Sequence, residues 1–364
     1  MKSRILFFST LVFTVLFIFS SCSDDDKNDN ITPPQLVPNG AYVINSGGKG
    51  NNAASITYYD LDSKQVRTGI FESVNGIGLG DTGESMIVYG NKIYVAVYNS
   101  GIIYVLDKNC KILSTIQSET ADKIQPREFE AYNGKVYVSL YEGYLARIDT
   151  TTMKIDKKIA VGPNPESVKA ANNKIYVANS GGMNSKNGYN NTVSVVDPEL
   201  TSSKEIEVGM NPQEFKMDKY NNLYLISRGN YKTDETAVPN KLQQINTTTD
   251  KVTVLEEGHS FLMFPYGDKL YLVNKVYVNS IPVSTVSCYN ITEKKVVEEN
   301  FITDGTVISD ISGIEFEPAS GDIYVLAANK KNNGDVYVFS SAGKLQNKFD
   351  TGGSYPMGIS FIKK

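Results

Sequence analysis

Seven tyrosine-centred segments recur along the chain, and this repeat constrains the fold more than any other feature. Each segment follows a turn and places its tyrosine among alternating apolar residues that favour β-structure. The central residues are Tyr42, Tyr94, Tyr137, Tyr176, Tyr224, Tyr271 and Tyr324. Their spacing, 39 to 53 residues, is typical of the blades of a β-propeller.

Every repeat continues with the same further elements. A second predicted strand ends in a residue suited to a tight turn, because Asp and Asn side chains accept hydrogen bonds from backbone N–H groups two residues on. These end residues are Asp60, Asp107, Asp149, Asp197, Asn246, Asn290 and Ser340. A third strand follows, as at 157–162 and 204–209, and a Pro-containing link then enters a fourth, as at 125–132. Each repeat is therefore predicted to form a four-stranded blade.

The two ends of the repeat region predict how the ring closes. The first repeat begins directly at its tyrosine strand (40–48) and lacks the strand that opens the other repeats. The C-terminal segment 354–364 resembles such an opening strand, for example 164–171. We therefore expect an all-β, seven-bladed β-propeller over residues 40–364, closed by a C-terminal strand that completes the first blade and removes an exposed edge.

The N-terminus has the layout of a secretory signal. Lys2 and Arg4 precede an uncharged apolar run (5–20), and small residues then precede Cys22. This pattern predicts a lipoprotein signal peptide over 1–21 and a lipidated Cys22. Residues 22–39 form a predicted acidic, Pro-rich, flexible tether. The alternative is an uncleaved N-terminal anchor, although the apolar run is shorter than the roughly 20 residues that span a bilayer.

The amino-acid composition argues against several kinds of function. Formal net charge is −4 with scattered Lys and Arg, so we expect no nucleic-acid partner. Cys110 and Cys288 lie in different repeats, which argues against a disulfide. The single histidine, His259, excludes a multi-His metal site and argues against a Ser-His-Asp triad. It is either a surface side chain or a single axial ligand or hydrogen-bond donor to a bound cofactor. The sequence accordingly predicts no metal, no resident cofactor and no enzyme activity.

Long, polar loops gather at one predicted face of the propeller. They span 45–54, 179–191, 227–240, 274–284 and 328–334, whereas the turns at the other face are short. Long loops on a rigid scaffold commonly serve binding. Aligning the links between blades also predicts a ring of side chains at the mouth of the central channel, namely Glu84, Arg127, Glu166, Gln213, Phe261, a residue near Ser312, and Met357.

The motif "SCSDDD", the "[KD]-[IVL]-Y-[VL]" blade strands and the links "GPNPES" and "GMNPQEF" carry a resemblance to a known family. The chain resembles the YncE-like surface propellers of Bacteroidetes lipoproteins and, within them, the cobalamin-binding BtuG family. That resemblance implies a lipid-anchored protein on the outer-membrane surface. It also implies capture of cobalamin, or a related corrinoid, for delivery to a BtuB-like TonB-dependent transporter.

A loop face of this composition offers hydrogen-bonding and stacking groups to the amides, phosphate and flat ring of cobalamin. The predicted ligand contacts are Tyr98, Asn99, Arg127, Tyr141, Asn179, Tyr189, Arg228, Tyr231, Lys275 and Tyr355. Two alternatives remain at this point. One is a surface-layer or adhesion propeller that binds protein or glycan. The other is a lactonase-like hydrolase with a metal held by Glu84 and Glu166.

Overall fold

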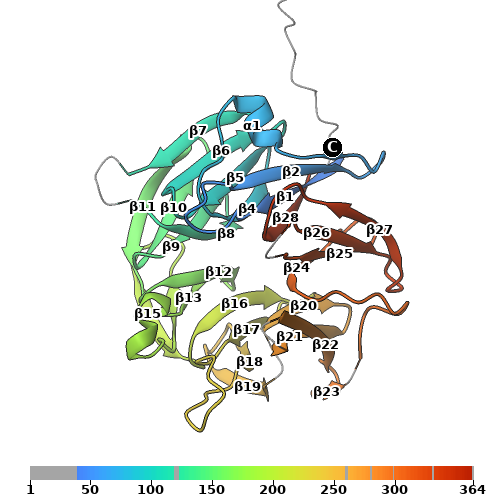
Figure 1. Cartoon of the computed structure of the whole chain (residues 1–364). Helices are drawn as coiled ribbons and strands as arrows, with labels where there is room; N and C mark the ends of the chain where they lie inside the picture. Colours follow the sequence, from blue (N-terminus) through green and yellow to red (C-terminus); the bar gives the residue numbers. More distant parts are fainter. Residues whose placement is uncertain are drawn as a thin grey trace, which may run out of the picture. The chain divides into compact units, whose positions relative to one another are not determined.

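The computed structural model describes residues 39–362, apart from 119–122, 259–260, 279–280, 298 and 330–331. These residues form seven four-stranded antiparallel sheets arranged around a central axis (Figure 1), which confirms the predicted fold class. The predicted signal peptide, Cys22, nearly all of the tether and His259 lie outside the described residues.

The blades follow one another in chain order, and their first-named strands are adjacent around the axis. Blade 1 consists of β28 (Pro356–Ile362), β1 (Gly40–Asn45), β2 (Ser55–Asp60) and β3 (Val66–Arg67). Blade 2 consists of β4 (Gly83–Tyr89), β5 (Lys92–Val97), β6 (Ile102–Asp107) and β7 (Ile112–Gln117). Blade 3 consists of β8 (Pro126–Tyr132), β9 (Lys135–Leu140), β10 (Tyr144–Asp149) and β11 (Lys154–Ala160).

The remaining blades have the same layout. Blade 4 consists of β12 (Pro165–Ala171), β13 (Lys174–Asn179), β14 (Thr192–Val196) and β15 (Ser203–Glu207). Blade 5 consists of β16 (Pro212–Met217), β17 (Leu223–Ser227), β18 (Lys241–Ile245) and β19 (Val252–Glu257). Blade 6 consists of β20 (Leu262–Tyr266), β21 (Lys269–Val278), β22 (Ile281–Asn290) and β23 (Lys295–Val297). Blade 7 consists of β24 (Ile311–Phe316), β25 (Ile323–Ala327), β26 (Asp335–Phe339) and β27 (Leu345–Asp350).

Closure of the ring follows the prediction. Strand β28 pairs antiparallel with β1, from Gly40 opposite Ile362 to Asn45 opposite Pro356. The last strand of the chain is therefore the inner strand of the first blade, and the inner edge of β1 is not left exposed.

The seven repeat tyrosines are buried, and several of them fasten one blade to the next. The Tyr42 hydroxyl donates to the Lys108 carbonyl oxygen at 2.8 Å, and the Tyr137 hydroxyl donates to the Pro198 carbonyl oxygen at 2.8 Å. In each case the acceptor lies in the following blade, just after its third strand. A buried tyrosine hydroxyl usually has a partner, so Tyr42 and Tyr137 both fill the core and link adjacent blades. The Tyr224 hydroxyl instead donates to Asp218 within blade 5.

The predicted turn residues act as expected. Oδ1 of Asp149 accepts from the backbone N–H groups of Thr151 and Thr152, at 3.0 and 2.8 Å, and Asn246 accepts in the same way from Thr248 and Thr249. Equivalent bonds occur at Asp60, Asp107, Asp197 and Asn290. Cys110 and Cys288 are free and buried, in agreement with the absence of a predicted disulfide.

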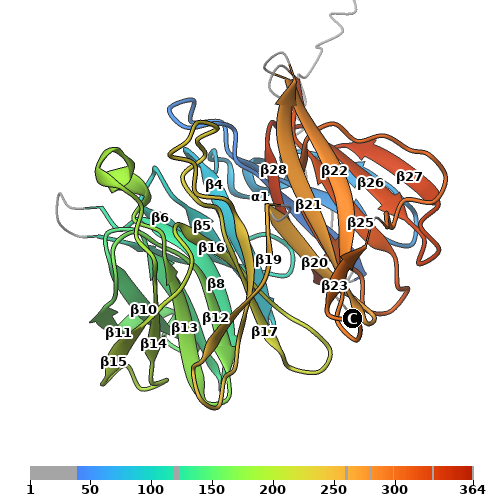
Figure 2. The same cartoon turned by 90° about the horizontal axis from the view of Figure 1, so that it is seen from below.

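Long connections emerge at one end of the blades, which we call the loop face. One of them contains a 3-10 helix (η1, Gly182–Asn187), and the hairpin of β21 and β22 rises above the neighbouring strands (Figure 2). A short helix that the sequence did not predict, α1 (Ile70–Asn75), lies in the link between blades 1 and 2 and buries Ile70 and Phe71. In the part of the chain that the structure describes, no helix has the length and apolar character needed to cross a membrane.

Candidate functional site

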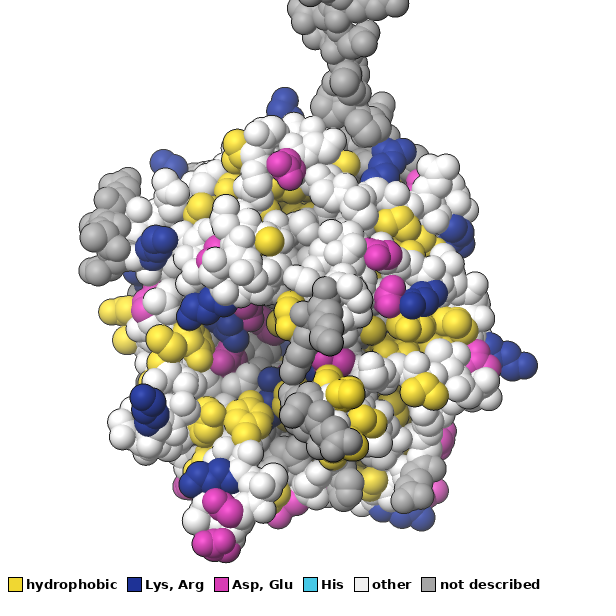
Figure 3. Space-filling model, viewed as in Figure 1, with side chains coloured by type: hydrophobic (Ala, Val, Ile, Leu, Met, Phe, Trp, Pro, Cys, Tyr) yellow, Lys and Arg dark blue, Asp and Glu magenta, His cyan; other side chains and the backbone are white. Residues whose placement is uncertain are grey.

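A polar cavity of about 270 Å³ lies in the central channel and opens on the loop face. Figure 3 shows the hollow at the middle of the ring, with acidic and basic side chains inside it. The predicted ring is largely confirmed in position, because Glu84, Arg127, Glu166, Gln213, Ser312 and Met357 all line the cavity. The seventh member, Phe261, contacts the cavity residue Arg228.

The cavity also contains charged residues that the sequence alignment missed. In blade 3 the register of β8 against β9 shifts between Pro126 and Phe129, which marks a β-bulge with one extra residue. Two consecutive residues, Arg127 and Glu128, therefore both reach the channel. Similar shifts occur in β12, β16 and β24. The missed charged residues are Glu128, Glu214, Lys216 and Glu315.

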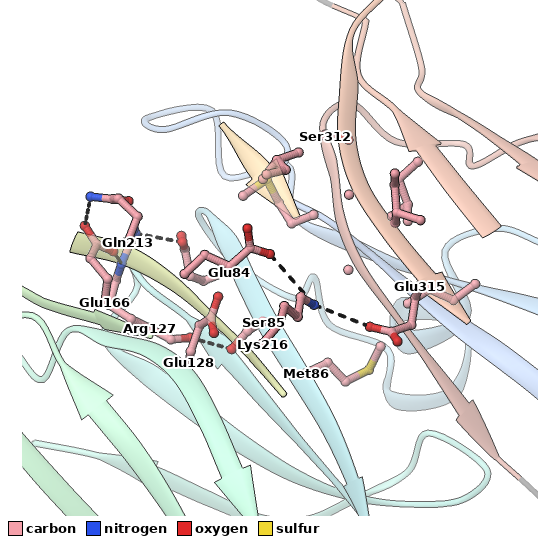
Figure 4. Close-up of a pocket in the computed structure, with 18 of the residues that line it drawn as sticks. Glu84, Ser85, Met86, Arg127, Glu128, Glu166, Gln213, Lys216, Ser312 and Glu315 are labelled. Carbon is pink, nitrogen blue, oxygen red and sulfur yellow. Dashed lines mark hydrogen bonds and ion pairs between the residues drawn. The ribbon is translucent and has the colours of Figure 1, made fainter. Parts of the chain in front are cut away.

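Arg127 is the centre of a buried ion cluster on one side of the mouth (Figure 4). Its Nη1 lies 2.7 Å from Glu84 Oε1, and its Nε donates to Glu166 Oε2 at 2.8 Å. Two rings hold the same guanidinium, with Cζ 5.3 Å from the Tyr98 centroid and 4.9 Å from the Tyr141 centroid. These distances are those of cation–π contacts, so Arg127 is fixed by four side chains.

The cluster perturbs the acid–base properties of its members. Burial raises the pKa of Glu84 to about 7, although the nearby Arg127 opposes this shift. For Arg127 burial disfavours the charge, yet Glu84 and Glu166 outweigh it and raise the guanidinium pKa. Near neutral pH, Glu84 is therefore protonated in part of the molecules.

Lys216 forms a bridge across the channel below the mouth. Its Nζ lies 3.8 Å from Glu214 Oε1 and 3.8 Å from Glu315 Oε2, which come from blades 5 and 7 (Figure 4). A second, wider cavity of about 860 Å³ opens on the other side of this bridge, and its wall combines apolar residues with charged ones. Lys216 and Glu315 line both cavities, so this ion bridge marks the floor of the polar mouth.

A different arrangement occupies the opposite rim of the mouth, in blades 5 and 6. The Arg228 guanidinium lies 4.1 Å above the Phe261 ring, and its Nε donates to the Phe261 carbonyl oxygen at 3.1 Å. Lys275 Nζ lies 5.2 Å from the same ring and 2.8 Å from Asp310 Oδ1. This rim therefore holds two cations, of which only Lys275 has a carboxylate within ion-pair distance, whereas two carboxylates flank the single cation Arg127.

The structure brings the predicted ligand contacts together in three groups. Tyr98, Arg127 and Tyr141 form the ion cluster, Arg228 and Lys275 form the opposite rim, and Tyr189 packs edge-on against Tyr231 at 5.8 Å on the long loops. Tyr98 and Tyr141 are each 9% exposed, so their rings contact Arg127 and are nearly inaccessible from the surface.

Three predicted contacts are arranged differently. Asn179 is fully buried, and its Nδ2 donates to Ser194 within blade 4. The Asn99 amide donates to Asp81 Oδ2 at 2.5 Å. Tyr355 is half-buried in the link to β28. Asn179 therefore has a structural contact inside its blade and presents no side-chain surface to the cavity.

Glu84 and Glu166, which the hydrolase alternative assigns to a metal, both flank Arg127. A guanidinium thus already lies between them. Among the described residues, no group of three or more His, Cys, Asp or Glu side chains is arranged to hold a metal ion.

A family model described as "Domain of unknown function (DUF5074)" matches residues 39–361. The chain belongs to this family. No curated protein matches the sequence significantly. The match extends over all seven blades.

Solved structures with the same fold are distant in sequence. A proposed 6-phosphogluconolactonase from Bacteroides uniformis has a TM-score of 0.60 at 13% identity, over 90% of this chain and 100% of that chain. The extracellular domain of the one-component system BT4673 from B. thetaiotaomicron has a TM-score of 0.58 at 10% identity, over 84% of this chain and 42% of that chain. Dihydro-heme d1 dehydrogenase NirN in complex with DHE has a TM-score of 0.53 at 12% identity, over 88% of this chain and 75% of that chain.

These similarities correct the prediction that the chain is not an enzyme. Two of the three structures carry the names of enzymes, so a propeller of this kind does not exclude catalysis. The prediction was wrong because it took the scarcity of histidine as evidence against all enzyme chemistry. At these identities the similarity shows the fold alone, and it assigns no activity to this chain.

Proposed function

We propose that this chain captures a ligand on its loop face, over the mouth of the polar cavity, and that the ligand is cobalamin or a related corrinoid. The observation that carries the proposal is the position of the cavity at the centre of the face where the longest loops gather. Binding sites commonly combine a concave pocket with a few fixed polar groups on a rigid scaffold.

The size of the cavity defines how such a ligand binds. Pockets that enclose drug-sized ligands measure roughly 300–1,000 Å³, and the mouth measures about 270 Å³. A corrinoid therefore lies over the face and inserts one substituent into the mouth. The exposed rim offers apolar contacts at Tyr231 and Met183, which are 53% and 67% exposed.

The polar lining matches the edge of a corrinoid in kind. The amide side chains of the corrinoid donate hydrogen bonds that Glu84 and Glu166 can accept. The same amide groups accept hydrogen bonds from cationic side chains of the protein. Because Arg127 is held by four side chains, little conformational freedom is lost when a ligand binds there.

Calorimetric titration with cyanocobalamin tests the proposal. The protein is a form of the chain that starts at residue 31 and keeps the whole closed ring. We expect saturable binding with a Kd below 1 µM, an order-of-magnitude expectation for a pre-organised site. The absence of both binding heat and a thermal shift at high ligand concentration would contradict the proposal that the chain binds cobalamin.

A pair of tyrosine variants locates the binding face. Tyr231→Ala removes an exposed ring on the loop face and is expected to weaken binding about 3- to 10-fold, as for one aromatic contact of about 0.5–1.5 kcal/mol. Tyr220→Ala is the matched control, because Tyr220 is similarly exposed at 57% in the short turn between β16 and β17. Equal effects of the two variants would contradict binding on the loop face.

We further propose lipid anchorage at the outer-membrane surface through Cys22 and delivery of the ligand to a TonB-dependent transporter. The N-terminal sequence supports anchorage, and exposed Val276, Val278 and Ile281 on the β21–β22 hairpin support contact with a protein partner. Cys22→Ala is expected to release the protein from the membrane fraction. Retention of this variant in that fraction would contradict lipid anchorage at Cys22.

A further inference from the structure

Arg228 differs from the other cations at the mouth because its charge has no ion-pair partner among the described residues. Arg127 contacts two carboxylates, and Lys275 contacts Asp310. Arg228 is half-buried and lines the cavity, yet its side-chain hydrogen bonds within the described part of the chain are with neutral oxygens. A cation that is partly removed from water without a carboxylate in direct contact is costly, and an anion bound beside Arg228 would offset that cost.

The guanidinium is nevertheless held in a defined position. The Arg228 backbone N–H donates to the Asn211 carbonyl oxygen at 2.8 Å, Nε donates to the Phe261 carbonyl oxygen, and Cζ lies 4.1 Å from the Phe261 ring centroid. Among the residues that the structure describes, Nη1 makes only a long contact, 3.5 Å, with Gln213 Oε1. The terminal N–H groups of the fork therefore keep donor capacity for a ligand.

The surroundings support an anion at this position. Lys275 shares the Phe261 ring with Arg228 and adds a second cation, although Asp310 pairs with it. The Asn211 amide nitrogen is buried without a partner among the described residues, so a second donor in this region lacks an acceptor. Glu214 also lines the cavity, and its charge interacts with that of Arg228. Its ion-pair contact, however, is to Lys216 at 3.8 Å, so it does not occupy the guanidinium fork of Arg228.

We propose that Arg228 is the anchor of an anion subsite that takes a phosphodiester or carboxylate group of the ligand. A planar guanidinium binds such groups through two parallel hydrogen bonds, which fixes their orientation as well as their position. This inference deepens the proposed function, since in a cobalamin the group is the phosphodiester of the nucleotide loop. In that orientation, the carboxylates around Arg127 face the uncharged amide groups of the corrinoid.

Two corrinoids separate the role of this subsite from binding of the ring. Cyanocobalamin carries the phosphodiester, whereas dicyanocobinamide has the same macrocycle without the nucleotide loop. We expect Arg228→Gln to weaken cyanocobalamin about 10- to 100-fold, the usual range for a hydrogen bond to a charged group. The same variant is expected to change dicyanocobinamide binding less than about 3-fold. An equal loss for both corrinoids, or a loss for neither, overturns the subsite.

Two further variants complete the titrations. Arg228→Lys keeps the charge but loses the fork, so its effect on cyanocobalamin is expected to be intermediate. Lys186→Gln removes the same charge from an exposed position of η1 on the same face, and it controls for general electrostatics. Unchanged thermal unfolding temperatures show that each variant is folded.

A simple anion keeps the inference testable if no corrinoid binds. Inorganic phosphate is compared with chloride at equal ionic strength, and the thermal shift is followed in the wild-type chain and in Arg228→Gln. A phosphate-dependent shift that the variant loses supports the anion subsite while the cobalamin proposal fails. If no corrinoid binds and phosphate shifts the unfolding temperature of the wild-type chain and of Arg228→Gln equally, both the anion subsite and the cobalamin proposal are overturned.

Discussion

Glu84 gives the sharpest test of the buried ion cluster, because its pKa is raised from an ordinary value of 4.5 to about 7 by burial. Between these values the folded chain holds a proton on Glu84 that the unfolded chain releases. Stability therefore falls as pH rises through this window. At about 1.4 kcal/mol per unit of pH, the free energy of unfolding decreases by about 3 kcal/mol from pH 4.5 to pH 8.

The substitution Glu84→Gln removes this dependence, since an amide does not titrate, and it leaves Glu166 to pair with Arg127. We expect the difference in unfolding free energy, variant minus wild type, to increase by about 3 kcal/mol between pH 4.5 and pH 8. The assay is denaturant unfolding at several pH values, with slopes against denaturant concentration compared to confirm a common unfolded state.

Taking the difference between two proteins cancels the titration of every other group that the substitution does not disturb. The matched control is Glu205→Gln, which removes the same charge from an exposed position on the outer strand β15. A variant-minus-wild-type difference that stays constant with pH, within about 0.5 kcal/mol, would refute the reasoning, because it would mean that Glu84 titrates alike in both states.

Two further predictions concern the ring itself. Although burial opposes the charge of Asp250, hydrogen bonds from Lys174, Lys204 and Tyr176 lower its pKa, so the stabilisation is present at neutral pH and is lost as pH falls through the lowered value. Asp250→Asn is expected to cost about 2–4 kcal/mol in urea unfolding at pH 7, and a loss under about 0.5 kcal/mol would contradict this. Deleting residues 354–364 removes β28 and exposes the inner edge of β1, so we expect loss of cooperative thermal unfolding by circular dichroism; an unchanged melting transition would show that this strand does not close the ring.

The sequence predicted the blades because their signals are local. Tyrosine strands, Asp and Asn turns and Pro-containing links each repeat at a fixed place in the blade, and the structure confirms all three. The missing first strand and the matching last strand then determined closure, since an unpaired edge is unfavourable.

The candidate site was predicted less completely, for two physical reasons. Bulges in the inner strands place consecutive residues such as Arg127 and Glu128 in the channel, so one residue per blade gives an incomplete set. A pair of polar residues just after the proline, as in "PRE" and "PQE", is the signal that could have found them. Side-chain direction was the second obstacle: Asn179 ends a predicted strand at the loop face, but its amide turns into hydrogen bonds inside blade 4.

The tyrosine links and the Asx turns occupy the end of the blades opposite the loop face, as the acceptors at Lys108 and Pro198 show. These links between blades are thus separated in space from the long loops of the loop face. Mutations in the long loops can accumulate without loosening the contacts between blades, so this architecture permits ligand preference to diverge quickly while the scaffold changes slowly. Within the family, sequence variation is accordingly expected to concentrate at one pole of the propeller.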